Sequence, residues 1–165
     1  MKVELQPFYQ TEDLLLDVNY SIENNILRMD YILRGALIEE IELSKEVSTP
    51  KRTDDLWKDS CFELFLFHKS GAYWEINLSP SKNWNIYKFR SYRDGMQREN
   101  KINRINIKTD KQENQFLLTT KINFNKILDF EDVNLAFTAV TKDKSGEINY
   151  WALKHLEKPD FHKFI

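Results

Sequence analysis

The sequence predicts an all-β fold, an antiparallel β-sandwich of two sheets in a single domain over residues 1–165. Segments rich in β-branched and aromatic residues recur at intervals of about ten residues and are separated by short polar turns. Aromatic residues make up 13% of the chain, against only four glycines and four prolines. This composition is typical of strands in a packed sheet. The sequence has neither a long helical periodicity nor an internal repeat, and no linker marks a second domain.

The first predicted elements form a β-hairpin. Residues 13–22 (DLLLDVNYSI) and 26–34 (ILRMDYILR) are predicted as strands that are joined by the polar turn at residues 23–25. Residues 37–46 (LIEEIELSKE) fit both a helical turn and a short strand, and we favour the strand. Residues 47–55 contain proline, threonine and charged residues, and we expect a loop there.

The centre of the chain predicts a second pair of strands. Residues 60–67 (SCFELFLF) are apolar on both faces, which indicates a central strand, and residues 72–79 (AYWEINLS) return as its partner. Two registers are open, because a slip of one residue moves every side chain to the other face. A plain four-residue loop would place Glu63 opposite Ile76, and a bulge would place it opposite Asn77. One face of the second strand holds Tyr73, Glu75 and Asn77.

Five further segments of the C-terminal half show strand-like patterns. These segments are residues 84–92 (WNIYKFRSY), 101–109 (KINRINIKT), 115–123 (QFLLTTKIN), 134–141 (NLAFTAVT) and 147–153 (EINYWAL). Residues 124–132 (FNKILDFED) fit a short helix between two of these strands.

Charge and cysteine content exclude several classes of protein. The net charge is −2 and the basic residues are dispersed, so we expect no nucleic-acid partner. No apolar run approaches the roughly 18 residues that span a bilayer. With one cysteine and no apolar run at the N-terminus, we expect a cytoplasmic protein without an internal disulfide. Cys61 lies in an apolar strand, where a buried thiol is expected instead of a nucleophile.

The common catalytic motifs are absent, so we expect no enzyme. There is no glycine-rich phosphate loop, histidine pair at helical spacing, cysteine pair or nucleophile elbow. Glu63 and Glu75 resemble the carboxylate pair of a glycosidase, but a carboxylate that holds Arg90 or Arg93 is the more ordinary interpretation. The scattered histidines predict no metal site, since such a site needs three or four convergent ligands.

Aromatic and polar side chains together suggest a ligand site. Aromatic rings stack on the C–H faces of sugars, while carboxylates, amides and guanidinium groups bind the hydroxyls. The aromatic candidates for such a site are Trp57, Trp84, Tyr87 and Trp151. The alternative is that the tryptophans fill the core, in a structural or protein-interaction domain that binds no small ligand.

Three motifs resemble those of the bacterial DOMON-like proteins. They are LWKDSCFELF from Leu56, a longer motif from Tyr73 to Met96 that contains YWE, SPS and YRDGM, and YWALKHLEKPDFH from Tyr150. These proteins belong to a β-sandwich superfamily that includes the family 9 carbohydrate-binding modules. The resemblance runs from about Leu27 to the C-terminus. It implies a jelly-roll or immunoglobulin-like sandwich and a non-catalytic domain that binds sugars or haem.

The resemblance also implies roles for individual residues. In the sugar-binding relatives a tryptophan precedes a strand glutamate by six residues, as Trp57 precedes Glu63, and a second tryptophan resembles Trp151. Asn77 and Arg90 are candidates for the remaining polar contacts. With the resemblance, the expected ligand-binding residues are Trp57, Glu63, Asn77, Trp84, Arg90 and Trp151. We therefore expect a carbohydrate or a sugar-containing metabolite as the ligand and no cofactor. In the haem-binding relatives the axial ligands are a methionine and a histidine, so the alternative is haem b on Met96 with His155 or His162.

Overall fold

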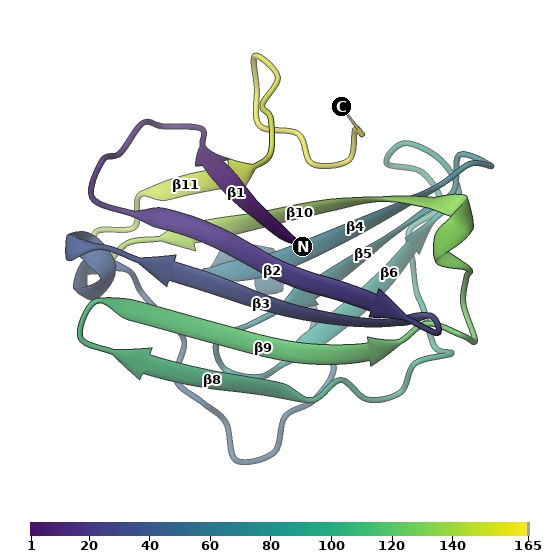
Figure 1. Cartoon of the computed structure of the whole chain (residues 1–165), viewed down its shortest axis with the longest axis horizontal. Coiled ribbons are helices and arrows are strands. Elements are labelled where there is room, and N and C mark those ends of the chain that lie inside the picture. The colour runs from purple at the N-terminus through teal and green to yellow at the C-terminus, as the bar shows by residue number, and fades with distance from the viewer. Residues whose placement is uncertain (165) are drawn as a thin grey trace.

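The computed structural model describes residues 1–164, and their eleven strands form one continuous antiparallel sheet. The sheet curls over so that its two halves lie face to face (Figure 1). The strands are β1 (Lys2–Pro7), β2 (Leu15–Glu23), β3 (Ile26–Arg34), β4 (Cys61–His68), β5 (Tyr73–Leu78), β6 (Trp84–Phe89), β7 (Gln97–Arg98), β8 (Ile107–Gln112), β9 (Gln115–Asn123), β10 (Val133–Lys142) and β11 (Ile148–Ala152). Three short 3₁₀ helices are η1 (Ala36–Glu40), η2 (Leu56–Lys58) and η3 (Phe130–Asp132).

The all-β prediction is confirmed, but a single sheet takes the place of the two that were expected. The strand order is β7-β6-β5-β4-β10-β11-β1-β2-β3-β9-β8. The strand β1, which was not predicted, joins the halves. Its Leu5 lies opposite Leu16 of β2, whereas its Gln6 lies opposite Ala152 of β11. Because β1 changes partner along its length, the hydrogen-bonded ladder continues from one half into the other.

Apolar side chains from both halves fill the space between them. Tyr31 of β3 packs against Phe62 of β4 with ring centroids 5.2 Å apart. The core also includes Trp84 and Trp151, both buried. Burial of apolar surface of this kind is the main favourable contribution to folding. The face of β4, β5 and β6 that points away from this core carries a second, smaller aromatic cluster around Phe65.

Several predicted elements agree with the structure. The predicted hairpin corresponds to β2 and β3, with Glu23 opposite Ile26 at its turn. The short helix that was expected within residues 124–132 is η3. Among residues 1–164, no helix has the length and apolar character that crossing a bilayer requires.

Three predicted elements differ from the structure. Residues 37–40 belong to the 3₁₀ helix η1 and not to a strand, because Gly35 at φ 140° redirects the chain and Ile38 turns into the core. The strand that was expected over residues 84–92 ends at Phe89, where a turn closes as Arg90 N–H donates to the Asp94 carbonyl at 3.0 Å. The strand that was expected at 101–109 begins only at Ile107. The short strand β7 was not predicted.

The β4–β5 hairpin fixes the register that was left open. Its tip consists of Lys69, Ser70 and Gly71, and His68 N–H donates to the Ala72 carbonyl at 2.9 Å. Gly71 has φ 90°, which suits the last position of a three-residue loop that ends in a bulge. The loop therefore contains one residue fewer than the plain four-residue turn, and Glu63 lies opposite Asn77. The bulged alternative is confirmed.

Candidate functional site

A cavity of about 450 Å³ lies on the sheet face that points away from the core. We call it the glutamate cavity, because Glu63 and Glu75 both line it. Its floor is formed by side chains of one face of β4, β5, β6, β10 and β11. These are Glu63, Phe65, Glu75, Phe89, Val140 and Tyr150. Side chains alternate between the faces of a strand, so the register of the ladder brings these residues together.

The walls of the glutamate cavity come from loops and from the C-terminal segment. Trp57 of η2 forms one wall, and Arg93 and Met96 from the loop between β6 and β7 form another. The last wall consists of Pro159, Phe161 and His162, which follow β11 in the segment that is yellow in Figure 1. Arg93 fixes this segment through a salt bridge with Asp160 at 3.0 Å.

The two carboxyl groups of the floor are buried and only partly hydrogen-bonded. Glu63 is 2% exposed, and its Oε2 accepts a hydrogen bond from Thr138 Oγ1 at 3.2 Å. Glu75 is 5% exposed, and its Oε1 accepts from Asn77 Nδ2 at 3.0 Å. Within residues 1–164, the other oxygens, Glu63 Oε1 and Glu75 Oε2, accept no hydrogen bond. Buried carboxyl groups normally have partners, so these free oxygens mark a site that a ligand can complete.

Burial changes the protonation of both carboxyl groups. It raises the pKa of Glu75 from an ordinary 4.5 to about 7, against the opposing effects of the Asn77 hydrogen bond and the Arg93 charge. Burial, followed by repulsion from Glu75, raises the pKa of Glu63 well above its ordinary value. Low polarity penalises the charged form of an acid, and two neighbouring acids resist ionising together. At neutral pH the pair therefore retains at least one proton.

His162 faces the same floor in its neutral form. The main-chain N–H of Arg93 donates to Tyr73 Oη at 3.0 Å, so we assign the Tyr73 hydroxyl as donor to His162 Nδ1 at 2.8 Å. The ring proton then lies on Nε2, which is 3.9 Å from Glu75 Oε2. Burial is the main reason that the pKa of His162 falls to about 4, so the imidazole supplies no positive charge at neutral pH.

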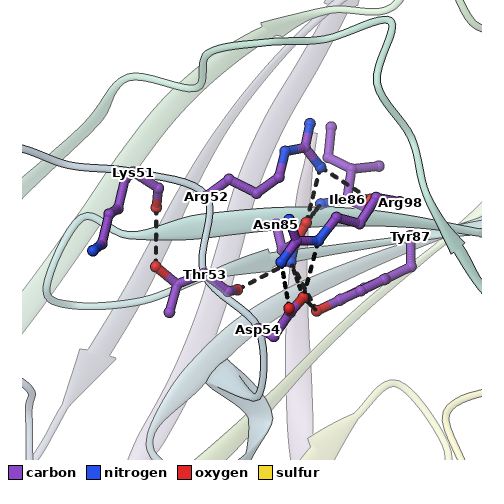
Figure 2. Close-up of polar contacts among 8 residues, drawn as sticks. All are labelled: Lys51, Arg52, Thr53, Asp54, Asn85, Ile86, Tyr87 and Arg98. Atoms are coloured by element: carbon purple, nitrogen blue, oxygen red, sulfur yellow. Dashed lines mark hydrogen bonds and ion pairs between the residues drawn. The ribbon is translucent and has the colours of Figure 1, made fainter.

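A polar network holds the wall that carries Trp57 (Figure 2). The ring of Trp57 lies edge-on to Tyr87 with centroids 5.8 Å apart. Tyr87 Oη donates to Asp54 Oδ1 at 2.7 Å, and Asn85 Nδ2 donates to the same oxygen at 2.9 Å. Arg98 adds an ion pair to Asp54. Asp54 precedes η2 by two residues, so this network fixes the start of the short helix that presents Trp57.

Arg52 anchors the loop before this network. Its guanidinium lies 4.5 Å from the centre of the Trp84 ring and donates to Asn85 Oδ1 at 2.9 Å. It also donates to the main-chain carbonyls of Glu99 and Ile102, at 2.8 and 2.7 Å. A planar guanidinium has five N–H donors and can hold several carbonyls at once. Trp84 is therefore packed beneath an arginine, away from the glutamate cavity.

The structure brings some of the expected site residues together and separates others. Trp57 and Glu63 line the glutamate cavity, while Asn77 is buried beside it and reaches it through Glu75. Trp84 and Trp151 lie in the core between the two halves, where Trp151 Nε1 donates to Thr141 Oγ1 at 2.9 Å. Arg90 is exposed and pairs with Asp94.

The residues named for haem are also separated. Met96 and His162 line the glutamate cavity. His155 does not line it. Its Nε2 lies 2.7 Å from the main-chain carbonyl of Gln6, and its ring contacts Phe8.

Several cavity residues were not expected from the sequence. Glu75 was considered only as part of an acid pair and Arg93 only as a partner for a carboxylate. No role had been predicted for Phe65, Phe89, Val140, Tyr150 and Phe161. Because side chains alternate along β4, Phe65 lies on the same face as Glu63. Strand pairing then places Glu75 of β5 and Phe89 of β6 on that face. A prediction from these residues would have required the register, which depends on the bulged turn.

Comparison with known proteins shows the fold alone. No family model matches the sequence, and no curated protein matches it. The crystal structure of a proposed carbohydrate-binding protein from Bacteroides uniformis superposes with a TM-score of 0.67 at 11% identity, covering 99% of this chain and 82% of that one. A family 9 carbohydrate-binding module from Caldicellulosiruptor kristjanssonii, solved with glucose, gives a TM-score of 0.46 at 16% identity, covering 90% of this chain and 73% of that one. The chain therefore has the β fold of the Bacteroides protein.

Proposed function

We propose that this protein binds a small carbohydrate or a sugar-containing metabolite in the glutamate cavity, without catalysing a reaction. The observation that carries the proposal is the combination of aromatic rings with two buried carboxyl groups that each have a free oxygen. Sugar rings present both C–H faces and hydroxyl donors, which match these two kinds of surface. The volume of about 450 Å³ lies within the range of roughly 300–1,000 Å³ that is usual for small-ligand sites.

Each group has a defined role in this proposal. Trp57, whose ring contacts Tyr87 edge-on, stacks on the apolar face of the sugar. Glu63 Oε1 and Glu75 Oε2 accept hydrogen bonds from hydroxyl groups, and Asn77 orients Glu75 from below. His162 Nε2–H is a donor at the wall formed by the C-terminal segment. Trp84, Trp151 and Arg90 take no direct part in this arrangement.

The placement of the glutamates supports binding over hydrolysis. In a glycosidase the two carboxyl groups flank the scissile bond, and one of them must be ionised. Here both groups rise from neighbouring strands on one floor, and burial favours their protonated forms. They therefore approach a ligand from the same side.

The fold and the motifs support the same class. We propose that the chain is a variant of the sandwich shared by DOMON-like proteins and family 9 carbohydrate-binding modules, in which β1 joins the two layers. In support, the Bacteroides protein has the same fold over 99% of this chain. Trp57 and Glu63, which have the spacing of the sugar-binding relatives, line one cavity.

A calorimetric screen of neutral sugars, amino sugars and sugar phosphates tests the proposal. For a sugar that binds the wild type, we expect Trp57→Ala and Glu63→Gln each to weaken affinity by about tenfold or more, since each removes a direct contact. Glu99→Gln is the matched control, because Glu99 is a buried carboxylate outside the cavity that accepts from Trp74 Nε1 at 3.1 Å. Binding of no sugar by the wild type, or full affinity in Trp57→Ala, would contradict the proposal.

Haem b is the second candidate, because Met96 and His162 line the same cavity. The floor fits this group poorly, since two buried carboxyl groups lie where an apolar macrocycle would pack. An absorption spectrum after addition of haem distinguishes the candidates. A Soret band that is lost in both Met96→Ala and His162→Ala would establish haem binding. An unchanged spectrum would remove it.

A further inference from the structure

We propose that the glutamate cavity selects a ligand with a protonated amine, and that the carbohydrate class it takes is an amino sugar. This inference rests on the proposed function, which it narrows from sugars in general to cationic ones. It is carried by the contacts of Glu63 and Glu75, by the aromatic lining around them and by the position of the nearest basic side chains.

Within residues 1–164, the two acids of the cavity accept no hydrogen bond from a basic side chain. Arg93 is the guanidinium in the lining, and its NH2 and Nε groups already bind Asp160 and Tyr92, at 3.0 and 3.3 Å. The imidazole of His162 is neutral, and its Nε2 is 3.9 Å from Glu75 Oε2, beyond hydrogen-bond length. Buried acids are usually paired with a positive charge. The glutamate pair retains a proton instead, and a cationic ligand can displace this proton and supply the positive charge.

A third acceptor lies beside the two carboxyl groups. Asn77 Oδ1 is fully buried and has no hydrogen-bond partner within residues 1–164. Asn77 is the cross-strand neighbour of Glu63 and donates its amide hydrogen to Glu75. This side of the cavity therefore has unpaired oxygens, and a donor from the ligand can replace the proton that the glutamate pair retains. An ammonium group has three donors and no acceptor, which complements such a floor.

The lining above the floor also suits a cation. Apart from Trp57, which stacks on the sugar ring, the rings of Phe65, Phe89, Tyr150 and Phe161 contribute to it. Aromatic faces attract cations through the negative potential above the ring, and cages of such rings recognise ammonium groups. A metal ion fits less well, because residues 1–164 contain no group of three or more histidine, cysteine, aspartate or glutamate side chains that could hold one. An organic cation that also has an apolar body satisfies both the floor and the walls.

Matched sugars test this inference directly. Glucosamine, galactosamine and mannosamine are each compared by calorimetry with the parent hexose and with the N-acetyl form, which keeps the nitrogen but removes its charge. We expect at least one amine to bind ten times or more tighter than both of its neutral counterparts. Methylammonium and choline are included as amines without a sugar ring.

Variants separate the contribution of the charge from that of the ring. We expect Glu63→Gln and Glu75→Gln to reduce the preference for the amine to about threefold or less, because an amide attracts an ammonium less than a carboxylate does. Trp57→Ala should weaken amine and parent sugar by similar factors, and Glu99→Gln should leave the preference unchanged.

The outcomes distinguish this inference from the proposed function. If a neutral hexose or its N-acetyl form binds as tightly as the amine, the protein binds carbohydrate and the inference is overturned. If methylammonium or choline binds while every sugar fails, carbohydrate binding is overturned and the ammonium subsite stands. If none of these compounds binds, both are overturned.

Discussion

The hydroxyl of Tyr31 on β3 donates a hydrogen bond to the main-chain carbonyl of Glu63 on β4. Tyr31 is fully buried in the core between the two halves of the sheet. The contact therefore links the half that contains β3 to the strand that forms the cavity floor. A change in the core at Tyr31 is thus transmitted to the main chain of a site residue.

Tyr31→Phe should reduce the stability of the fold. The ring contacts with Phe62 and Phe137 remain, but the Glu63 carbonyl loses its donor from the facing half. Loss of a buried hydrogen bond costs about 1–2 kcal/mol of unfolding free energy. Urea denaturation measures this change. Tyr9→Phe is the control, because Tyr9 is 58% exposed and should change the unfolding free energy by less than about 0.5 kcal/mol. Equal stability of both variants would show that the Tyr31 contact has no net effect.

The pH dependence of stability should reveal opposed groups in the cavity, with Glu63 and Glu75 acting in one direction and His162 in the other. The folded pKa of Glu75 is about 7, above its ordinary 4.5. The contribution of Glu75 to the free energy of unfolding is therefore complete below pH 4.5 and is lost as pH rises through 7. This contribution amounts to roughly 3 kcal/mol at most. The folded pKa of His162 is about 4, below its ordinary 6.5. The contribution of His162 to stability is present above pH 6.5 and is lost as pH falls through 4. The pH-dependent contributions of Glu75 and His162 therefore partly cancel between pH 4.5 and 6.5.

Removing Glu75 or His162 should reveal the pH dependence that the removed residue had offset. We expect Glu75→Gln to lose stability more steeply than the wild type as pH falls from 6.5 to 4. We expect His162→Gln to lose stability more steeply as pH rises from 4.5 to 7. Denaturation midpoints at half-unit pH intervals measure both slopes. Parallel profiles for the three proteins would refute the raised pKa of Glu75 and the lowered pKa of His162.

Two adjacent aspartates should respond differently to the same substitution. Asp54→Asn weakens the bonds from Tyr87, Asn85 and Arg98, and we expect the melting temperature to fall by a few degrees, as for a loss of about 1 kcal/mol. Asp55→Asn is the matched control. Among residues 1–164, the Asp55 carboxylate pairs only with Lys58 at the surface, and Asp55 has φ 62°, a conformation that asparagine tolerates. A similar fall in both variants would show that the network around Asp54 adds no specific stability.

Cys61 should be unreactive while the protein is folded. The thiol is fully buried on β4, and burial raises its pKa well above the ordinary value, so little thiolate is present. We expect Ellman's reagent to label it only in denaturant, with a labelling curve that follows unfolding. Rapid labelling in buffer alone would mean that β4 opens locally.

Much of the sheet could be predicted because its strands have strong patterns. The leucine, isoleucine and tyrosine content of residues 26–34 after a polar turn identified β3, and the apolar run at 60–67 identified β4. β1 and β7 have weaker signals. β1 is a short segment with only two alternating apolar residues, Val3 and Leu5, and β7 has two residues. Such strands form because neighbouring strands offer hydrogen-bond partners, a tertiary effect that local sequence does not encode.

The site was harder to predict, because the chemical type of a residue does not say which face it occupies. Trp57 and Trp84 are both tryptophans near the same motif, yet one lines the cavity and the other packs in the core under Arg52. The ladder distinguishes them. Asn77 pairs with Asn85, so the neighbouring Trp84 faces the opposite side. The C-terminal wall could not be placed either, since no strand pattern fixes residues 159–162.

That C-terminal wall has a consequence for how recognition can change. Pro159, Phe161 and His162 lie outside all eleven strands, so they shape the cavity without contributing to the ladder. The floor is constrained by pairing on both sides, whereas this segment is fixed mainly by side chains such as Arg93 and Tyr73. Exchange of a few terminal residues can therefore alter ligand preference while the scaffold stays intact. The paired strands of the floor must be kept for the fold, whereas the residues of the C-terminal wall are free to vary. This segment is therefore the natural place to engineer a new specificity.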